Sequence, residues 1–394
     1  MDPILNPYSP GAGTPPPELA GRDDLLNKGR IAVERLKLGR STKSLILVGL
    51  RGVGKTVLLD RLRENAQRAG VHTLRIEAPE NRSLPAILAP QLRQTLLTLS
   101  RDDRAEETAR RALRALAGFV QALRLKYGDI EVGLDFDPEP GLADNGDLEH
   151  DLQVLLESVG LAAKAADTVV VLFVDELQYV AEDQLAALIV GMHRVAQSSL
   201  PLTLFGAALP LLPGRLGRAK SYAERLFEFS AIGALDKRAA RDAIEIPALK
   251  NDVTVTDDAI AEIITQTEGY PYFLQEWGKH SWDVAARSPI SRKDVVAASR
   301  SATIDLDDNF FRVRFDRLTP NERRYLRGMA ELGPGPHRSG DIADQLGRPV
   351  NSFGPVRAQL INKGMLWSPH HGDTAFTVPL FDAFMRRIMP GDIW

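Results

Sequence analysis

The chain of 394 residues contains no cysteine, which excludes disulfide bonds and thiolate metal ligands. Its seven histidines are scattered, and neither their spacing nor the carboxylates next to them in the sequence indicate a metal site. No segment approaches twenty uninterrupted apolar residues, so we expect no membrane span and no membrane partner. The first residues lack the charged start and apolar core of a signal peptide, and the cytoplasm is therefore the expected location.

The chain also lacks an excess of charge of either sign. Its 49 lysines and arginines against 52 aspartates and glutamates give a formal net charge of −3. This near balance argues mildly against avid non-specific binding of nucleic acid, although it does not exclude a local basic patch.

The most informative segment that is present lies at residues 49–56. It consists of Gly-Leu-Arg-Gly-Val-Gly-Lys-Thr, which fits the phosphate-binding pattern G-x-x-x-x-G-K-[ST]. The three glycines allow a tight turn in which successive backbone N–H groups point at a polyphosphate. An apolar run at 44–48 predicts a buried strand before this loop, and the helical spacing after it predicts that the loop opens a helix. The chain is therefore predicted to bind ATP or GTP.

This phosphate-binding loop also predicts individual ligands of the nucleotide. The ammonium group of Lys55 would reach the β- and γ-phosphates, and the hydroxyl of Thr56 would ligate Mg²⁺. The complete predicted phosphate-binding set is Gly49, Arg51, Gly52, Val53, Gly54, Lys55, Thr56 and Val57.

A second motif of the same chemistry follows at residues 168–176. A β-branched apolar run at 168–174 ends in Asp175 and Glu176, the form of a Walker B strand. A carboxylate at the end of a buried strand is costly unless it faces a cation, so Asp175 is predicted to hold Mg²⁺. Glu176 is predicted to orient or deprotonate the water that attacks the γ-phosphate. The alternative, that the pair only caps the following helix, stays open.

The pattern of strands and helices predicts an α/β fold in three domains. Residues 1–17 are rich in proline and are expected to be extended. Strands are predicted at 44–48, 71–76, 168–174 and 202–206, and helical periodicity spans 84–126. These elements indicate a parallel sheet covered on both faces, in a core domain at 1–234. A helical lid is predicted at 235–316, with helices at 237–248, 256–268, 272–286 and 292–301.

The last predicted domain, residues 317–394, has the pattern of a winged helix. Its helices are expected at 319–330, 340–347 and 352–364, with Thr319 as the first N-cap, and a hairpin is expected at 365–378. The third helix of such a domain commonly enters the major groove of DNA. Candidate contacts to double-stranded DNA are Arg348, Asn351, Arg357, Asn362 and Lys363. Docking of a protein partner is the open alternative.

Together these motifs resemble the Orc1/Cdc6-like AAA+ ATPases, and even more the archaeal-type and bacterial ATPases that border the STAND signalling ATPases. This resemblance implies ATP, not GTP, as the nucleotide. It implies that Leu19, Gly21 and Arg22 border the adenine and that Pro271, in Gly269-Tyr-Pro, packs on it. It further implies that Arg225 contacts the γ-phosphate, usually that of a neighbouring subunit.

Two departures from the family pattern favour a slow nucleotide switch. The strand at 202–206 is followed by no polar sensor residue, and the lid carries Gly-x-Pro where many AAA+ proteins have a second sensor arginine. One hypothesis is a DNA-associated ATPase that uses ATP/ADP and Mg²⁺ and acts through the winged helix. The other is a signalling or defence ATPase whose winged helix docks a protein partner. Self-association on ATP binding is compatible with both hypotheses.

Overall fold

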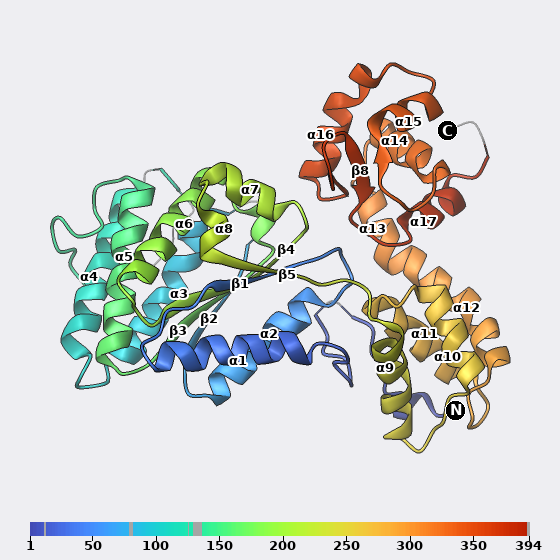
Figure 1. The fold of residues 1–394 in the computed structure, drawn as a ribbon, viewed down its shortest axis with the longest axis horizontal. Coiled ribbons are helices and arrows are strands. Elements are labelled where there is room, and N and C mark those ends of the chain that lie inside the picture. Colours follow the sequence, from blue (N-terminus) through green and yellow to red (C-terminus); the bar gives the residue numbers. More distant parts are fainter. Residues whose placement is uncertain (12, 79–81, 125, 129–135, 392–394) are drawn as a thin grey trace. The chain divides into compact units, whose positions relative to one another are not determined.

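The computed structural model describes residues 1–11, 13–78, 82–124, 126–128 and 136–391 (Figure 1). Packing divides the chain into two units. The sheet unit comprises Asp23–Val48 and Lys55–Ala231, and the lid unit comprises Met1–Arg22, Gly49–Gly54 and Ile232–Trp394. The bounds of these units differ from those of the three predicted domains, because the N-terminal residues and most of the phosphate-binding loop pack with the lid unit.

The sheet unit is built on five parallel strands in the order β2-β3-β4-β1-β5. Their bounds are β1 Ser44–Val48, β2 His72–Glu77, β3 Val170–Asp175, β4 Leu202–Ala208 and β5 Phe227–Ala231. The three central strands β1, β3 and β4 are almost entirely buried, as expected for apolar runs with helices on both sides. The predicted parallel α/β fold is confirmed.

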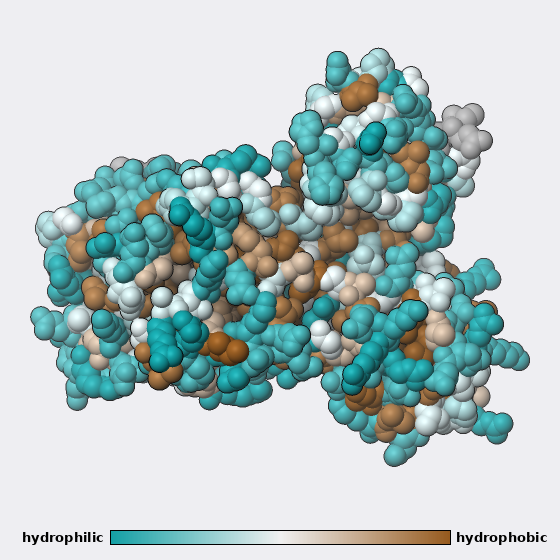
Figure 2. All heavy atoms as spheres, viewed as in Figure 1, coloured by the Kyte–Doolittle hydropathy of each residue, from teal (hydrophilic) through white to brown (hydrophobic). Residues whose placement is uncertain are grey.

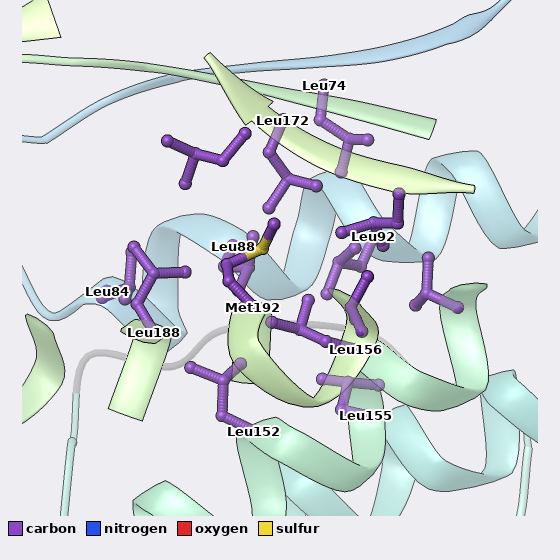
Figure 3. Close-up of a cluster of buried hydrophobic side chains, with 14 of the residues drawn as sticks. Leu74, Leu84, Leu88, Leu92, Leu152, Leu155, Leu156, Leu172, Leu188 and Met192 are labelled. Carbon is purple, nitrogen blue, oxygen red and sulfur yellow. The ribbon is translucent and has the colours of Figure 1, made fainter. Parts of the chain in front are cut away.

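Alternate residues of the strands face two different helical layers. Leu74 and Leu172 point toward a cluster of leucines from α3 (Leu84–Leu99), α5 (Leu148–Ala165) and α6 (Glu182–Gln197), which Figure 3 shows in close-up. The rings of Phe173 and Phe205 lie edge to face on the opposite side, where α1 (Asp23–Lys37) packs on α2 (Lys55–Arg68). The period of two along each strand places its side chains on these two faces.

The remaining helices of the sheet unit complete its outer layer. The periodicity predicted over 84–126 corresponds to two helices, α3 and α4 (Glu106–Leu123), and residue 125 of that range lies outside the described residues. Helix α4 packs against α3 and α5 through an apolar stripe that includes Leu113 and Leu116. The short helices α7 (Leu212–Ala219) and α8 (Ala223–Leu226) lead into β5.

The first part of the lid unit is helical, as predicted. It contains α9 Lys237–Leu249, α10 Asp257–Thr267, α11 Pro271–Val284, α12 Arg292–Leu306, the π-helical turn η3 Asp307–Phe311 and α13 Arg312–Phe315. The described residues of the N-terminal segment form no helix or strand apart from the 3₁₀ turn η1 Pro3–Leu5, and the segment packs on these helices. The buried ring of Tyr8 lies against Gly278 of α11, and the backbone carbonyl of Asp2 accepts a hydrogen bond from the indole of Trp282.

The last part of the lid unit contains the elements in the predicted order, three helices followed by a hairpin. The helices are α14 Pro320–Glu331, α15 Ser339–Gln345 and α16 Gly354–Asn362, the last preceded by the 3₁₀ turn η4 Val350–Phe353. The strands are β6 His337–Arg338, β7 Leu366–Trp367 and β8 Asp373–Phe376, which form one sheet in the order β6-β8-β7. Thr319 is the N-cap of α14 in a capping box with Glu322, so that prediction is confirmed.

A final helix, α17 Phe381–Ile388, was not predicted from the sequence. It packs on α14, and its Phe384 stacks on Phe311 of η3. This aromatic contact joins the C-terminal elements to the lid helices. Hydrophilic residues cover most of the visible face of the C-terminal elements, with smaller hydrophobic patches (Figure 2).

Within the described part of the chain, every helix is too short or too polar to span a lipid bilayer.

Candidate functional site

The phosphate-binding loop has the backbone conformation that its glycines predict. Gly52 and Gly54 have φ values of +79° and +84°, in the left-handed region that side chains disfavour. Gly49 is required for a different reason, because a Cβ atom there would lie 2.2 Å from the carbonyl oxygen of Ile232. The three glycines of the motif are therefore needed by the fold of the loop as well as by its predicted chemistry.

Backbone groups of this loop are bonded to two distant parts of the lid unit. The N–H of Tyr272, in the first turn of α11, donates to the carbonyl of Gly52 at 3.2 Å. The N–H of Arg51 donates to the carbonyl of Thr377, which follows β8, at 2.9 Å. The loop is thus held by the lid helices on one side and by the C-terminal elements on another.

Arg22 also holds this loop. Its guanidinium donates to the carbonyl of Gly233 at 2.7 Å and to that of Val53 at 3.4 Å. Burial lowers the pKa of Arg22, and the charge of Asp236 partly counteracts this effect. Through its Nη2 atom Arg22 therefore joins the loop, at Val53, to the segment that contains Gly233.

The other residues that the family resemblance places near the adenine also belong to the lid unit. Leu19 is half-buried, and the neighbouring Gly21 has a φ of +67° and lies against the side chain of Ala239. Pro271 is the first residue of α11, two residues after Gly269, whose carbonyl accepts the N–H of Leu235 at 2.9 Å. Their contact with adenine stays a prediction.

The sheet unit carries the acidic half of the predicted site. Lys55 and Thr56 begin α2, and the hydroxyl of Thr56 donates to the Oδ2 atom of Asp175 at 2.7 Å. Asp175 is the last residue of β3 and is only 1% exposed. The two predicted Mg²⁺ ligands are therefore adjacent. Their hydroxyl and carboxylate oxygens are the hard donors that Mg²⁺ prefers.

Asp175 has a second partner, Arg75 of β2, which was not predicted from the sequence. The Nη2 atom of Arg75 lies 3.3 Å from Oδ2 of Asp175, and its Nε donates to Asp60 of α2 at 2.9 Å. Burial raises the pKa of Asp175, whereas the hydrogen bond from Thr56 and the charge of Arg75 lower it. An arginine inside the strand His-Thr-Leu-Arg-Ile-Glu was the signal available in the sequence.

Glu176 is set apart from the helix that follows it. Its backbone is left-handed, with a φ of +54°, and α6 has Ala181 as its N-cap. Glu176 occupies the N-cap position of the 3₁₀ turn η2 (Leu177–Tyr179), but its side chain makes no capping hydrogen bond there. This geometry argues against the alternative in which the acidic pair only caps the next helix.

The carboxylate of Glu176 is held by Gln178, a second residue that was not predicted from the sequence. The side-chain amide of Gln178 donates to Glu176, and its carbonyl oxygen accepts the N–H of Leu209, after β4, at 3.0 Å. Arg215 of α7 donates to the backbone carbonyls of Gln178 and Val180. Gln178 thus connects the acidic turn to the end of the neighbouring strand β4, which is followed by no polar sensor residue.

Arg225 lies on the short helix α8, and its side chain is exposed. Its backbone N–H donates to Tyr222, whereas no side-chain partner is found for it among the described residues. Val57 lies in the first turn of α2 and is half-buried. The roles of both residues stay predictions.

The candidate DNA contacts in the C-terminal elements divide into two groups. The guanidinium of Arg357 donates to Thr374, to Ser368 and to the carbonyl of Asp373, and the ammonium group of Lys363 donates to Glu322 at 2.7 Å. These two cations are therefore occupied inside the domain. Lys363 is nevertheless exposed, as are the other candidates, Arg348, Asn351 and Asn362.

Comparison with family models matches two parts of the chain. Residues 18–205 match the model described as AAA ATPase domain, and residues 308–385 match a domain of unknown function, DUF8462. The predicted resemblance to AAA+ ATPases is therefore confirmed for the first of these parts, and the match supports ATPase activity in general. No curated protein matches the chain.

The chain is also similar, at low identity, to solved structures, among them the following three. The Holliday junction branch migration motor RuvB of Thermotoga maritima is 17% identical, with a TM-score of 0.46 over 94% of this chain and 95% of that one. The Aeropyrum pernix Orc1 protein in complex with DNA is 15% identical, with a TM-score of 0.47 over 94% and 93% of the two chains. Cdc6p from Pyrobaculum aerophilum is 15% identical, with a TM-score of 0.44 over 98% of each chain.

Proposed function

We propose that this protein is an ATP-dependent switch that binds ATP with Mg²⁺, hydrolyses it slowly and couples the nucleotide state to its C-terminal domain. Three features support ATP as the ligand: the phosphate-binding pattern at 49–56, the acidic pair that ends β3, and the match of residues 18–205 to an AAA ATPase domain. The absence of a polar sensor residue after β4 supports slow turnover.

One observation carries the coupling, namely the two hydrogen bonds that join the phosphate-binding loop to Tyr272 and to Thr377. Successive N–H groups of such a loop turn toward a polyphosphate when it binds. A change in the backbone of Arg51 or Gly52 would therefore alter contacts with the lid and with the C-terminal domain at the same time. Nucleotide binding would in this way bias the position of the C-terminal domain, which would bind the partner.

The residues of the sheet unit divide the chemistry between them. Lys55 would bind the β- and γ-phosphates, and Thr56 and Asp175 would hold Mg²⁺, which neutralises phosphate charge when it is bound. Glu176 would orient or deprotonate the attacking water, and Gln178 would keep its carboxylate in place. Arg75 would hold Asp175 ionised and aligned.

We propose double-stranded DNA as the partner of the C-terminal domain, acting as a winged helix. The exposed Arg348, Asn351 and Asn362 lie in or beside α16 and η4, where they could reach phosphates or bases. Nucleotide-dependent binding of DNA would make the chain a DNA-associated ATPase.

A second candidate function is a STAND-type signalling or defence ATPase whose C-terminal domain docks a protein. The internal engagement of Arg357 and Lys363 favours it, because these hydrogen bonds compete with contacts from the same two side chains to a DNA backbone. The exposed Arg225 would then contact the nucleotide of a second copy during self-association on ATP binding.

The test is the fluorescence anisotropy of a labelled duplex titrated with the protein at two salt concentrations. It is run without nucleotide, with ADP and with a non-hydrolysable ATP analogue. Binding that depends on the nucleotide and weakens steeply with salt supports the DNA-associated ATPase. The absence of binding in all three states would refute a DNA role and favour protein docking, to be followed by light scattering and partner capture with Glu176→Gln.

A further inference from the structure

A cluster of three potential metal ligands lies away from the nucleotide site, between α11 and α12 of the lid unit. Glu276 and His280 are four residues apart and share one face of α11, and Asp305 projects from the last turn of α12. The Nε2 atom of His280 lies 3.0 Å from Oδ2 of Asp305 and 3.8 Å from Oε2 of Glu276. All three ligand atoms lie within 4.8 Å of one another.

Glu276 provides an independent reason to look for a ligand here. Its side chain is only 6% exposed, and its Oε2 atom has no hydrogen-bond partner in the described part of the chain. A buried carboxylate oxygen without a partner is unfavourable. Burial raises the pKa of this carboxyl, and a hydrogen bond with Tyr272 only partly offsets the effect.

An ion pair between His280 and Asp305 does not account for this arrangement. Such a pair satisfies the imidazole and Asp305, which is 40% exposed, but it leaves the Oε2 atom of Glu276 facing the cluster without a donor. Lys279 forms an ion pair with the exposed member, its Nζ atom 3.8 Å from Asp305, and its charge acts on Glu276 without a hydrogen bond to the Oε2 atom. The buried oxygen therefore lacks a cation or a donor at hydrogen-bond distance.

The spacing of the three atoms fits a small divalent ion. Zinc binds imidazole nitrogen and carboxylate oxygen at about 2.0–2.2 Å, which separates tetrahedral ligands by roughly 3.4 Å. The separations of 3.0 and 3.8 Å from the imidazole lie on either side of this value. One imidazole and two carboxylates suit Zn²⁺ and neighbouring transition metals better than Mg²⁺, which prefers an all-oxygen shell.

We propose that Glu276, His280 and Asp305 form a binding site for a divalent transition-metal ion, for which Zn²⁺ is the probe. The ion would cross-link α11 to α12, and the fourth position would be open to water or to an external ligand. The backbone N–H of Tyr272, in the first turn of α11, donates a hydrogen bond to the phosphate-binding loop. The ion would therefore also stiffen the helix pair that supports this loop. The packing of two helices creates the site, and for that reason the histidine spacing alone did not indicate it.

The test is calorimetric titration of chelator-treated full-length protein with ZnCl₂, in the absence of nucleotide and Mg²⁺. We expect one Zn²⁺ per chain, and a loss of affinity of more than about 100-fold in His280→Ala, since even outer-shell changes weaken metal sites by 10–100-fold. Asp305→Asn removes the most exposed ligand with the least disturbance of the fold, and it should also weaken binding. Co²⁺ should produce visible absorption bands in the parent protein that both variants lose.

The matched control is the double variant His370→Ala/His371→Ala, which removes an exposed histidine pair that could bind Zn²⁺ adventitiously. It should retain the site at full affinity. Zn²⁺ binding that persists in His280→Ala and Asp305→Asn but disappears in the control would overturn the proposal, as would the absence of any binding in the parent protein. A helical circular dichroism spectrum for each variant excludes unfolding as the cause of lost binding.

Discussion

The end of β3 and helix α16 both carry charged residues that the sequence assigned to a binding site. The structure agrees with these two predictions to different degrees. Asp175 at the end of β3 is buried beside Thr56 and Arg75, so the acidic pair occupies the position that its motif predicts. Arg357 on α16 was predicted to be available to DNA, yet it is bonded to three groups of its own domain. A motif with fixed spacing thus predicts which side chains lie together, whereas a cation on a helix does not reveal whether it is free to bind. The nucleotide chemistry of the acidic pair stays a prediction.

The largest expected effect is that of Lys55→Ala on nucleotide binding. Removal of two charge-assisted hydrogen bonds to phosphate costs about 3 kcal/mol, so the affinity for ATP should fall by about 100-fold or more. Equilibrium binding of a fluorescent ATP analogue measures this change. Lys43→Ala, at an exposed position just before β1, is the matched control and should bind normally. Equal affinity in the two variants would remove Lys55 from the site.

Glu176→Gln should separate hydrolysis from binding. Loss of the group that activates water should lower turnover by about 10²–10⁴-fold, while ATP affinity stays close to that of the parent protein. A steady-state phosphate-release assay, with the binding assay run in parallel, measures both quantities. Glu224→Gln, at an exposed position on α8, serves as the control. Unchanged turnover in Glu176→Gln would show that another residue activates the water.

Arg357→Ala tests whether this cation is structural. Its hydrogen bonds to Thr374, Ser368 and the carbonyl of Asp373 should contribute about 1–3 kcal/mol to the free energy of unfolding. Chemical denaturation should therefore detect a loss of stability in this variant, whether or not DNA is bound. An Arg357→Ala protein that is fully stable but binds DNA much more weakly would show that Arg357 is a DNA contact and not a structural cation.

The capping box of α14 should make the stability of the C-terminal domain depend on pH. Burial raises the pKa of Glu322, but hydrogen bonds from Lys363 and Thr319 outweigh it and leave the pKa below its ordinary value of 4.5. A carboxyl whose pKa is lowered by folding stabilises the native state above its unfolded pKa, and this contribution is lost as the pH falls through the folded value. Between pH 7 and about pH 4, the free energy of unfolding should therefore fall less in Glu322→Gln than in the parent protein. Chemical denaturation of both proteins at the two pH values measures this difference. An identical loss in both proteins would contradict this assignment.

The smallest expected effect is that of Arg348→Ala, an exposed candidate DNA contact. If it contacts a phosphate, its removal should reduce the slope of log affinity against log salt by about one, with little change in the free energy of unfolding. The anisotropy titrations described above measure this slope. An unchanged slope in a protein that still binds DNA would place the contact elsewhere.

Much of the sheet unit was predictable because its signals are local. The first strand was predicted at 44–48 and is found at Ser44–Val48, since an apolar run before a glycine loop leaves few alternatives. The lid helices and the capping box at Thr319 were also predicted, because helical periodicity and caps depend on near neighbours. Helix α17 was missed, because the aromatic contacts between Phe384 and Phe311 join segments far apart in the chain.

The sequence by itself determined the phosphate-binding loop and the acidic pair, because the chemistry of each depends on residues adjacent in the chain. Only the tertiary structure decided which groups distant in the sequence contact one another, at these motifs and elsewhere. It placed Arg75 against Asp175, joined the loop to Tyr272 and Thr377, and brought Asp305 to His280. These contacts result from the packing of helices and strands, whose registers depend on the whole buried interface and on no single local pattern.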